Sequence, residues 1–212
     1  MKHPAHLFLM LLLCCALRAE AQSNNFIFRL RSLQASSNLF DDDADNESFG
    51  LNLGYGKMIL GNRFGYDITG FGDWMKHNYY FDSNKRFEGA TLYTGLAVTP
   101  HYTFNPRSDV QFSVGVSFKA GYNQGYGSIK NRSDQNDDYN ERPESKTVNA
   151  GYSVAVAPMI TVSIPAGLGT IGLELGYDSS NYGRGINKLR SVYYPPLNYH
   201  SGYVFLGAFL RL

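Results

Sequence analysis

Strict alternation of apolar with small or polar residues marks the segment 110–122 and constrains the fold more than any other feature of the sequence. The apolar positions are Val110, Phe112, Val114, Val116, Phe118, Ala120 and Tyr122, and between them lie Gln111, Ser113, Gly115, Ser117, Lys119 and Gly121. A period of two indicates a β-strand with one apolar face, and this run is about twice the usual strand length. A tilted strand needs roughly 9–11 residues to cross the hydrocarbon of a membrane. The pattern therefore predicts a transmembrane strand.

Comparable alternation predicts seven more strands, over residues 26–33, 48–60, 63–76, 89–104, 147–164, 170–177 and 201–212. The connections are alternately long and short, which is typical of outer-membrane barrels with long external loops and short periplasmic turns. A sheet in hydrocarbon can pair all its backbone groups only by closing on itself. We expect an all-β protein, an eight-stranded antiparallel transmembrane β-barrel in an up-and-down meander. Both termini would be periplasmic, and the loops that start near residues 34, 77, 123 and 178 would be extracellular.

The N-terminal residues 1–21 have the features of a secretory signal peptide. A basic start at Lys2 precedes the apolar run 7–17, and Ala19-Glu20-Ala21 forms a small-x-small cleavage site. The barrel domain would then span residues 22–212, and both cysteines would leave with the signal. Lipidation at Cys14 or Cys15 is the alternative, but Leu13 or Cys14 then stands where a small residue is expected.

The composition excludes some classes of protein. The formal net charge is +1, so the chain lacks the basic stripe of a nucleic-acid-binding protein. After the N-terminus no run of eighteen apolar residues could form a transmembrane helix. Aromatic residues make up 15% and gather near the expected strand ends, as interfacial girdles do. The expected girdle residues are Tyr55, Trp74, Tyr79, Tyr80, Tyr102, Phe104, Tyr122, Tyr152, Tyr177 and Tyr203.

Charged or titratable residues on the non-lipid face are few: Arg29, Arg31, Asp67, His101, Lys119 and Glu174. Eight strands enclose a lumen that side chains can fill, so we expect these six to form a polar network inside the barrel. His101 has no serine and carboxylate at evident triad positions. We therefore predict no catalytic residue, no cofactor and no metal site.

Three local features lead to weaker hypotheses. Asp41, Asp43 and Asp45 have the spacing of an EF-hand start, but Asn46 and Asn52 replace the required glycine and glutamate. A solvated acidic loop is preferred to loose divalent binding. Tyrosines in the segments 122–127 and 193–196 either extend the strands or contact a ligand. Pro100 and Pro158 remove ladder hydrogen bonds, so we expect bulges there, near the periplasmic rim.

The C-terminal segment 207–212 resembles the strand signal of outer-membrane barrels. Gly207 is followed by alternating hydrophobic positions at Leu210 and Leu212, with leucine where an aromatic is usual at the end. With the signal peptide, the Tyr/Gly-rich strands and the related segments 97–102 and 155–160, the chain resembles the eight-stranded outer-membrane β-barrel domains of Bacteroidetes-type bacteria. These are often labelled porin family and are similar to OmpX- and OmpA-like barrels. The resemblance implies fold and compartment and carries over no functional residue.

These observations predict a monomeric protein in the outer membrane of a Gram-negative bacterium, with a structural or surface-interaction role and without strong conductance. Its expected partners are outer-membrane lipid, including lipopolysaccharide, and the barrel-assembly machinery, with no nucleic acid. Two alternatives stay open, a narrow porin-like channel for small solutes and a lipid A-modifying enzyme. A secreted, lipocalin-like barrel is a third, but its exterior of Gly, Ser and Ala would be poorly solvated.

Overall fold

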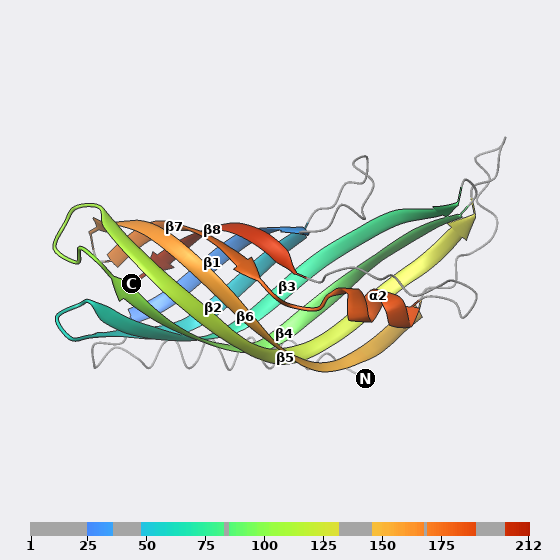
Figure 1. Cartoon of the computed structure of the whole chain (residues 1–212), viewed down its shortest axis with the longest axis horizontal. Coiled ribbons are helices and arrows are strands. Elements are labelled where there is room, and N and C mark those ends of the chain that lie inside the picture. The colour runs from blue at the N-terminus through green and yellow to red at the C-terminus, as the bar shows by residue number, and fades with distance from the viewer. Residues whose placement is uncertain (1–24, 36–47, 83–84, 132–145, 168, 190–201) are drawn as a thin grey trace.

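The computed structural model describes residues 25–35, 48–82, 85–131, 146–167, 169–189 and 202–212. Eight antiparallel strands, each paired with its neighbours in sequence, form a closed barrel (Figure 1). The strands are β1 (Asn25–Ala35), β2 (Ser48–Ile59), β3 (Phe64–Asp82), β4 (Lys85–Thr103), β5 (Gln111–Asn131), β6 (Lys146–Ala166), β7 (Gly169–Asp178) and β8 (Tyr203–Arg211). The pairing of β1 with β8 closes the sheet. The predicted fold class and strand number are confirmed.

Each strand turns apolar side chains outward and polar ones inward. Arg29, Asn52, Asp67, Lys119 and Glu174 are all at most 4% exposed, although they carry charges or amides. The outward positions include one large apolar side chain from every strand that is more than half exposed: Leu30, Phe49, Ile68, Leu96, Phe118, Val154, Leu173 and Leu206. An apolar exterior around a polar interior is the arrangement of a membrane barrel.

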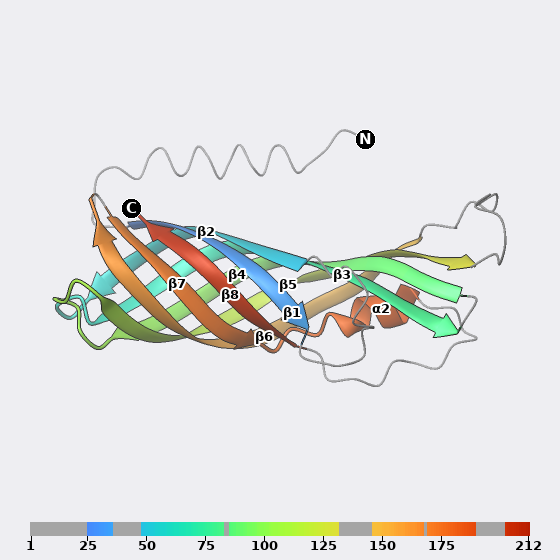
Figure 2. The same cartoon turned by 90° about the horizontal axis from the view of Figure 1, so that it is seen from above.

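The four central strands are about twice as long as the outer four. β3 and β4 have 19 residues each and β5 and β6 have 21 each, whereas β7 has 10 and β8 has 9. They extend past their neighbours at the end opposite the C-terminus (Figures 1 and 2). We call residues 76–82, 85–90, 126–131 and 146–151 the protruding sheet. β3 leaves β2 after the pair Ser48↔Met75, and β6 meets β7 only from the pair Met159↔Gly176 onward.

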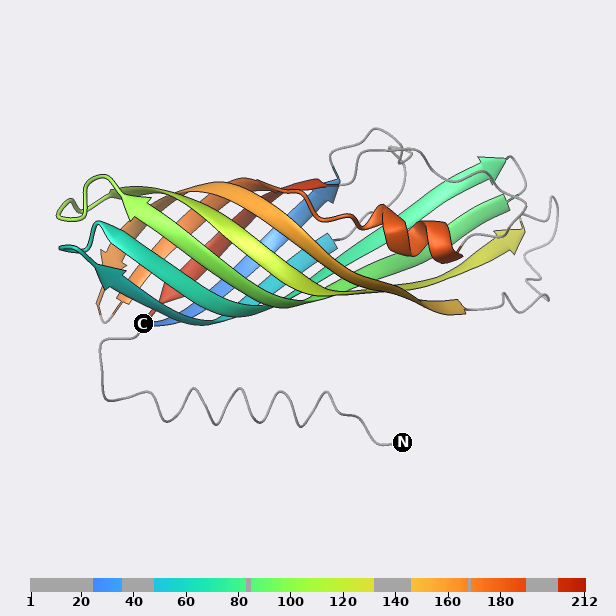
Figure 3. The same cartoon turned by 60° about the horizontal axis from the view of Figure 1, so that its bottom comes forward.

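The helix α2 (Gly183–Leu189) lies against the lumen-side face of the long strands (Figures 1 and 3). The Thr91 hydroxyl of β4 donates to the Tyr182 carbonyl just before the helix. A side chain in place of Gly185 would be 3.2 Å from the Thr91 hydroxyl and 3.4 Å from Gly125 of β5. Glycine at this position therefore lets the helix approach the sheet closely. In the described segments no helix is long and apolar enough to cross a membrane.

The expected loop 77–88 was wrong. Residues 77–82 belong to β3 and 85–88 to β4, and the two strands stay paired up to Asp82↔Lys85. Similarly, β5 continues from Asn123 to Asn131, so the tyrosine segment 122–127 extends a strand. The acidic segment 41–45, residues 193–196 and the signal peptide lie outside the described residues.

The expected bulges at the two prolines were also wrong. The register is the same on both sides of Pro100, which pairs with Tyr66, and of Pro158, which pairs with Val116. The amide of Phe104 donates to a carbonyl of β5. Because successive amides of a strand point to alternate sides, the nitrogen of Pro100 also faces β5. Residues 99 and 100 have no paired residue on that side. The amide of Val156 donates to the hydroxyl of Ser179, which follows the end of β7. By the same alternation, the nitrogen of Pro158 faces the β7 side, next to the first β6–β7 pair at Met159. Each proline therefore lies where a donor can be omitted without a change of register.

One bulge that the alternation did not predict lies on β6, near the protruding sheet. Asn123 pairs with Gly151 but Gln124 pairs with Asn149, so Ala150 is the extra residue. Gly151 has a φ of 85°, a conformation that glycine adopts readily. The bulge reverses the alternation: Tyr152 and Val154 point outward below it, while Thr147 and Asn149 point outward above it. The apolar exterior of β6 therefore ends at the bulge. The rings of Tyr122 and Tyr152 stack edge to face at this height, with centroids 5.1 Å apart.

Candidate functional site

The lumen holds two clusters of buried charges. The first lies toward the short turns and is centred on Asp67 of β3. Asp67 accepts hydrogen bonds from Arg29 of β1 and from Arg211 of β8, with Arg211 Nη2 at 3.0 Å from Oδ1. Asp67 is fully buried and Arg29 is 4% exposed. One carboxylate thus holds two guanidinium groups.

Glu174 of β7 links this cluster to the middle of the barrel. Its Oε1 accepts a hydrogen bond from Arg31 Nε, and its Oε2 lies 3.5 Å from Arg29 Nε. The guanidinium of Arg31 stacks on Phe205, with Cζ 4.3 Å from the ring centroid. Stacking on an aromatic face suits a planar cation that is almost wholly removed from water.

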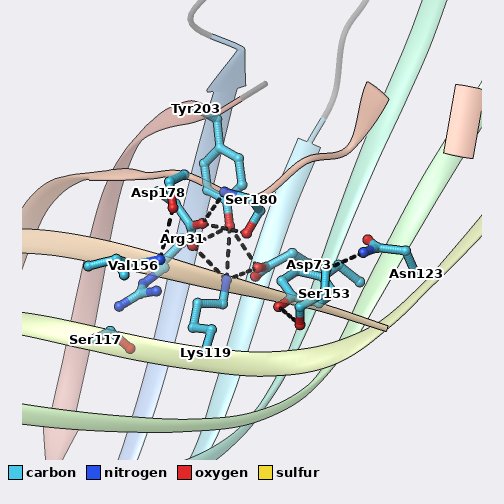
Figure 4. Close-up of polar contacts among 12 residues, drawn as sticks. Arg31, Asp73, Ser117, Lys119, Asn123, Ser153, Val156, Asp178, Ser180 and Tyr203 are labelled. Atoms are coloured by element: carbon cyan, nitrogen blue, oxygen red, sulfur yellow. Dashed lines mark hydrogen bonds and ion pairs between the residues drawn. The ribbon is translucent and has the colours of Figure 1, made fainter. Parts of the chain in front are cut away.

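The second cluster surrounds Lys119 of β5, toward the protruding sheet (Figure 4). Its ammonium donates to Asp73 Oδ2 and to Asp178 Oδ2, the latter at 2.6 Å. The Tyr203 hydroxyl lies 3.1 Å from the ammonium, 2.7 Å from Asp73 Oδ2 and 2.9 Å from Asp178 Oδ2. Asp178 also accepts from the amide and hydroxyl of Ser180. Side chains of β3, β7 and β8 therefore converge on the buried ammonium that β5 contributes.

Aromatic rings enclose the same ammonium. Lys119 Nζ lies 4.2 Å from the ring centroid of Phe71, 5.2 Å from that of Tyr93 and 5.7 Å from that of Tyr203. All three distances are within the range of cation–π attraction. Together with the two carboxylates, these rings replace the water that surrounds an exposed lysine side chain.

His101 of β4 borders the first cluster. Its Nδ1 lies 3.3 Å from the Thr99 carbonyl oxygen, and its Nε2 lies 3.2 Å from Met58 Sδ and 3.4 Å from Arg211 Nη2. Asp67 Oδ2 is 3.8 Å from Nδ1, beyond hydrogen-bond distance. No serine hydroxyl is among the hydrogen-bond partners of His101 in the described residues. These contacts do not assemble a nucleophile–base pair.

All six residues predicted for the lumen lie there, divided between the two clusters. Sequence reasoning missed four others: Asp73, Asp178, Tyr203 and Arg211. Tyr203 was expected in the aromatic girdle, which was wrong, because it is 1% exposed and contacts Lys119. Each missed residue lies an even number of residues from an inward-facing residue of the same strand. Asp73 is on the same face as Asp67, Asp178 as Glu174, and both Tyr203 and Arg211 as Gly207. Strict parity was the signal that could have found them.

The two clusters are complementary in charge. Arg29, Arg31 and Arg211 exceed Asp67 and Glu174 by one positive charge, and Asp73 and Asp178 exceed Lys119 by one negative charge. The ion-paired residues of the described lumen are therefore neutral in sum, with the positive end toward the short turns. Chemically this arrangement crosslinks β1, β3, β5, β7 and β8 through the interior.

Residues 7–187 match the outer membrane protein beta-barrel domain family. Among solved structures, neisserial surface protein A (NspA) has 13% sequence identity and a TM-score of 0.53, covering 90% of this chain and 97% of that chain. The attachment invasion locus protein Ail of Yersinia pestis has 12% identity and a TM-score of 0.43, covering 89% of this chain and 97% of that chain. None of the curated proteins matches the chain. At such identities the structural similarity concerns the fold alone.

Proposed function

Because the chain belongs to the outer membrane protein beta-barrel domain family, we propose that it is a non-conducting barrel of the bacterial outer membrane whose protruding sheet contacts proteins outside the cell. The apolar exterior fits the hydrocarbon, and the short turns, the start of β1 and the end of β8 face the periplasm. The protruding sheet then stands in the extracellular space. Its extension beyond the barrel is the observation that carries the proposal.

The outer edge of β3 is the part of this sheet best suited to a partner. Over residues 77–82, β3 has a strand partner only on its β4 side in the described chain. A free strand edge offers a row of backbone donors and acceptors to an extended segment of another protein. The opposite edge, on β6, is occupied, since Arg184 and Lys188 of α2 donate to the carbonyls of Tyr152 and Asn149. The partner surface we propose is therefore the β3 edge.

The contents of the lumen support non-conduction over the porin alternative. Two ion-paired clusters bridge opposite walls, and α2 covers the lumen-side face of β4 and β5 above them. An eight-stranded barrel is only wide enough for its own side chains. For the alternative of a lipid A-modifying enzyme, the contacts of His101 offer no catalytic arrangement.

The remaining expected partners follow from the compartment. The barrel contacts outer-membrane lipid, and we propose that this includes lipopolysaccharide on the extracellular side. Gly207, Leu210 and Leu212 would serve as the C-terminal signal that the barrel-assembly machinery reads. The paired edges of all eight strands favour a monomer, since closure leaves no strand edge within the membrane for a second copy.

Adhesion of bacteria that display the protein tests the surface role. Replacing residues 79–87 by Asn-Gly, a two-residue hairpin turn, removes four residues from β3 and three from β4 and preserves the pair Asn78↔Glu88. We expect cells with the full-length protein to adhere to cultured animal cells or to partner bacteria, and cells with the shortened protein to lose that adhesion at equal surface level. Arg107→Gln, an exposed change in the turn at the opposite end, is the control. Equal adhesion by full-length, shortened and empty-vector cells would contradict the proposal.

A further inference from the structure

A cavity of about 350 Å³ occupies the lumen at the end of the short turns. Asn62, Pro106 and Thr170, which lie in or beside the three short turns, form part of its wall, and so do Arg29 and Arg211. Its volume is within the range of small-molecule sites, roughly 300–1,000 Å³. Because its wall includes the turns, the cavity is accessible from the periplasm.

The charges on the cavity wall all have one sign. Among the residues that line it, only Arg29 and Arg211 carry a formal charge, and both are positive. Asp67, which pairs with both of them, does not reach the wall. A solute in the cavity therefore meets two guanidinium groups, and the carboxylates that pair with them, Asp67 and Glu174, are not part of the wall.

Some hydrogen-bond donors of these two arginines have no acceptor. Nη1 of Arg29 and Nε of Arg211 are buried and make no hydrogen bond in the described residues. Arg29 as a whole is 4% exposed. Buried polar groups are normally satisfied, so each of these two arginines keeps hydrogen-bonding capacity that the described residues leave unused. A guanidinium presents its donors in a fork that matches an oxyanion.

The rest of the wall supplies neutral hydrogen-bonding groups. Thr99, Thr103, Ser113, Thr161 and Ser163 contribute hydroxyls, and Gln111 contributes an amide. Thr99 and Thr103 already bond to Ser117 and Ser113, which fixes the wall of β4 against that of β5. Hydroxyls and amides can bond to the polar body of a ligand whose charged group is held by the arginines.

From these observations we propose that the cavity binds a small solute of the periplasm through an oxyanion, a carboxylate or a phosphate, held between Arg29 and Arg211. The solute enters between the short turns. This site is independent of the protruding sheet, which lies at the other end of the molecule.

Titration of the full chain with inorganic phosphate tests the site. The ¹⁵N-labelled protein, refolded in uncharged detergent, is titrated with sodium phosphate at constant pH and ionic strength, and the amide resonance of Gly115 and the Nε–H resonance of Arg211 are followed. Gly115 lines the cavity. We expect saturable shifts that fit one dissociation constant. A parallel titration with acetate shows whether a phosphate or a carboxylate binds more tightly.

Three variants separate a built site from general attraction. Arg211→Gln should weaken phosphate binding about tenfold, which corresponds to ~1.4 kcal/mol. Arg184→Gln removes the same charge from exposed α2 and should leave the binding unchanged. Ser163→Phe leaves the charge unchanged but fills the cavity and should abolish the shifts, which keeps the proposal testable if Arg211→Gln does not fold.

Linear shifts without saturation, or equal shifts with sodium chloride at the same ionic strength, would overturn the proposal. So would equal weakening by Arg184→Gln and Arg211→Gln, because net charge alone would then explain the binding.

Nanodiscs with phosphatidylglycerol but no free phosphate test the other source of a phosphate group, which is a lipid headgroup. Shifts in those nanodiscs would assign the cavity to a lipid headgroup and overturn a periplasmic solute.

Discussion

At the scale of single residues, Lys119 has the greatest consequence for stability. It is 2% exposed, and its ammonium is the cation that binds both Asp73 and Asp178. Lys119→Met keeps most of the side-chain volume but leaves two buried carboxylates around an apolar side chain. Removing one partner of a buried ion pair typically costs about 3–5 kcal/mol. We expect a loss of that size in the free energy of unfolding, measured by urea denaturation in lipid vesicles.

A second variant shows whether charge is the cause. In Lys119→Met/Asp73→Asn the lumen is neutral again, and Asp178 keeps its hydrogen bonds from Ser180. We expect this double variant to recover most of the lost stability. A loss below about 1 kcal/mol in the single variant, the level of an exposed ion pair, would contradict the account of Lys119 as an essential lumen cation.

Residue-scale prediction from sequence succeeded where alternation was followed and failed where composition replaced it. Arg29 and Glu174 were assigned to the lumen by parity alone. Tyr203 has the same parity as Gly207, yet it was assigned to the girdle because tyrosine is common there. Asp178 was assigned to a loop because it follows the last apolar residue of its strand. Partners across the lumen, such as Lys119 with Asp178, depend on strand tilt and register, which a single sequence does not encode locally.

At the scale of elements, the sequence predicted eight strands but underestimated the lengths of β3, β4 and β5. Above the membrane a strand no longer needs an apolar face, so the alternation weakens although the backbone ladder continues. The hairpin 77–88 and the segment 123–131 are of this kind. The bulge at Ala150 also interrupts the alternation on β6. Because the faces are reversed beyond the bulge, Val148 points inward, whereas strict alternation along β6 would place it on the outer face.

Gly151 allows an element-scale test of this bulge. Both Gly151 and Gly72 have room for a side chain, with the nearest atom at 3.8 Å from an added Cβ in each case. Only Gly151 has a positive φ, at 85°. Gly151→Val should therefore destabilise the protein by about 1–2 kcal/mol, whereas Gly72→Val should not, because valine favours strands. Urea denaturation of both variants measures the difference, and equal stability would show that the bulge does not require glycine.

At the scale of the whole molecule, closure should decide resistance to detergent. Every strand has a partner on both sides only because β1 joins β8, so the folded chain should withstand SDS at room temperature and migrate differently from the boiled chain. Deleting residues 203–212 turns β1 and β7 into open edges, and we expect that variant to migrate alike with and without heating. The variant shortened at 79–87 keeps every strand pair between β1 and β8, so it should retain the heat-dependent shift. Coincident bands for the unaltered chain would contradict a closed barrel, and loss of the shift in the shortened variant would make the protruding sheet part of what holds the barrel closed.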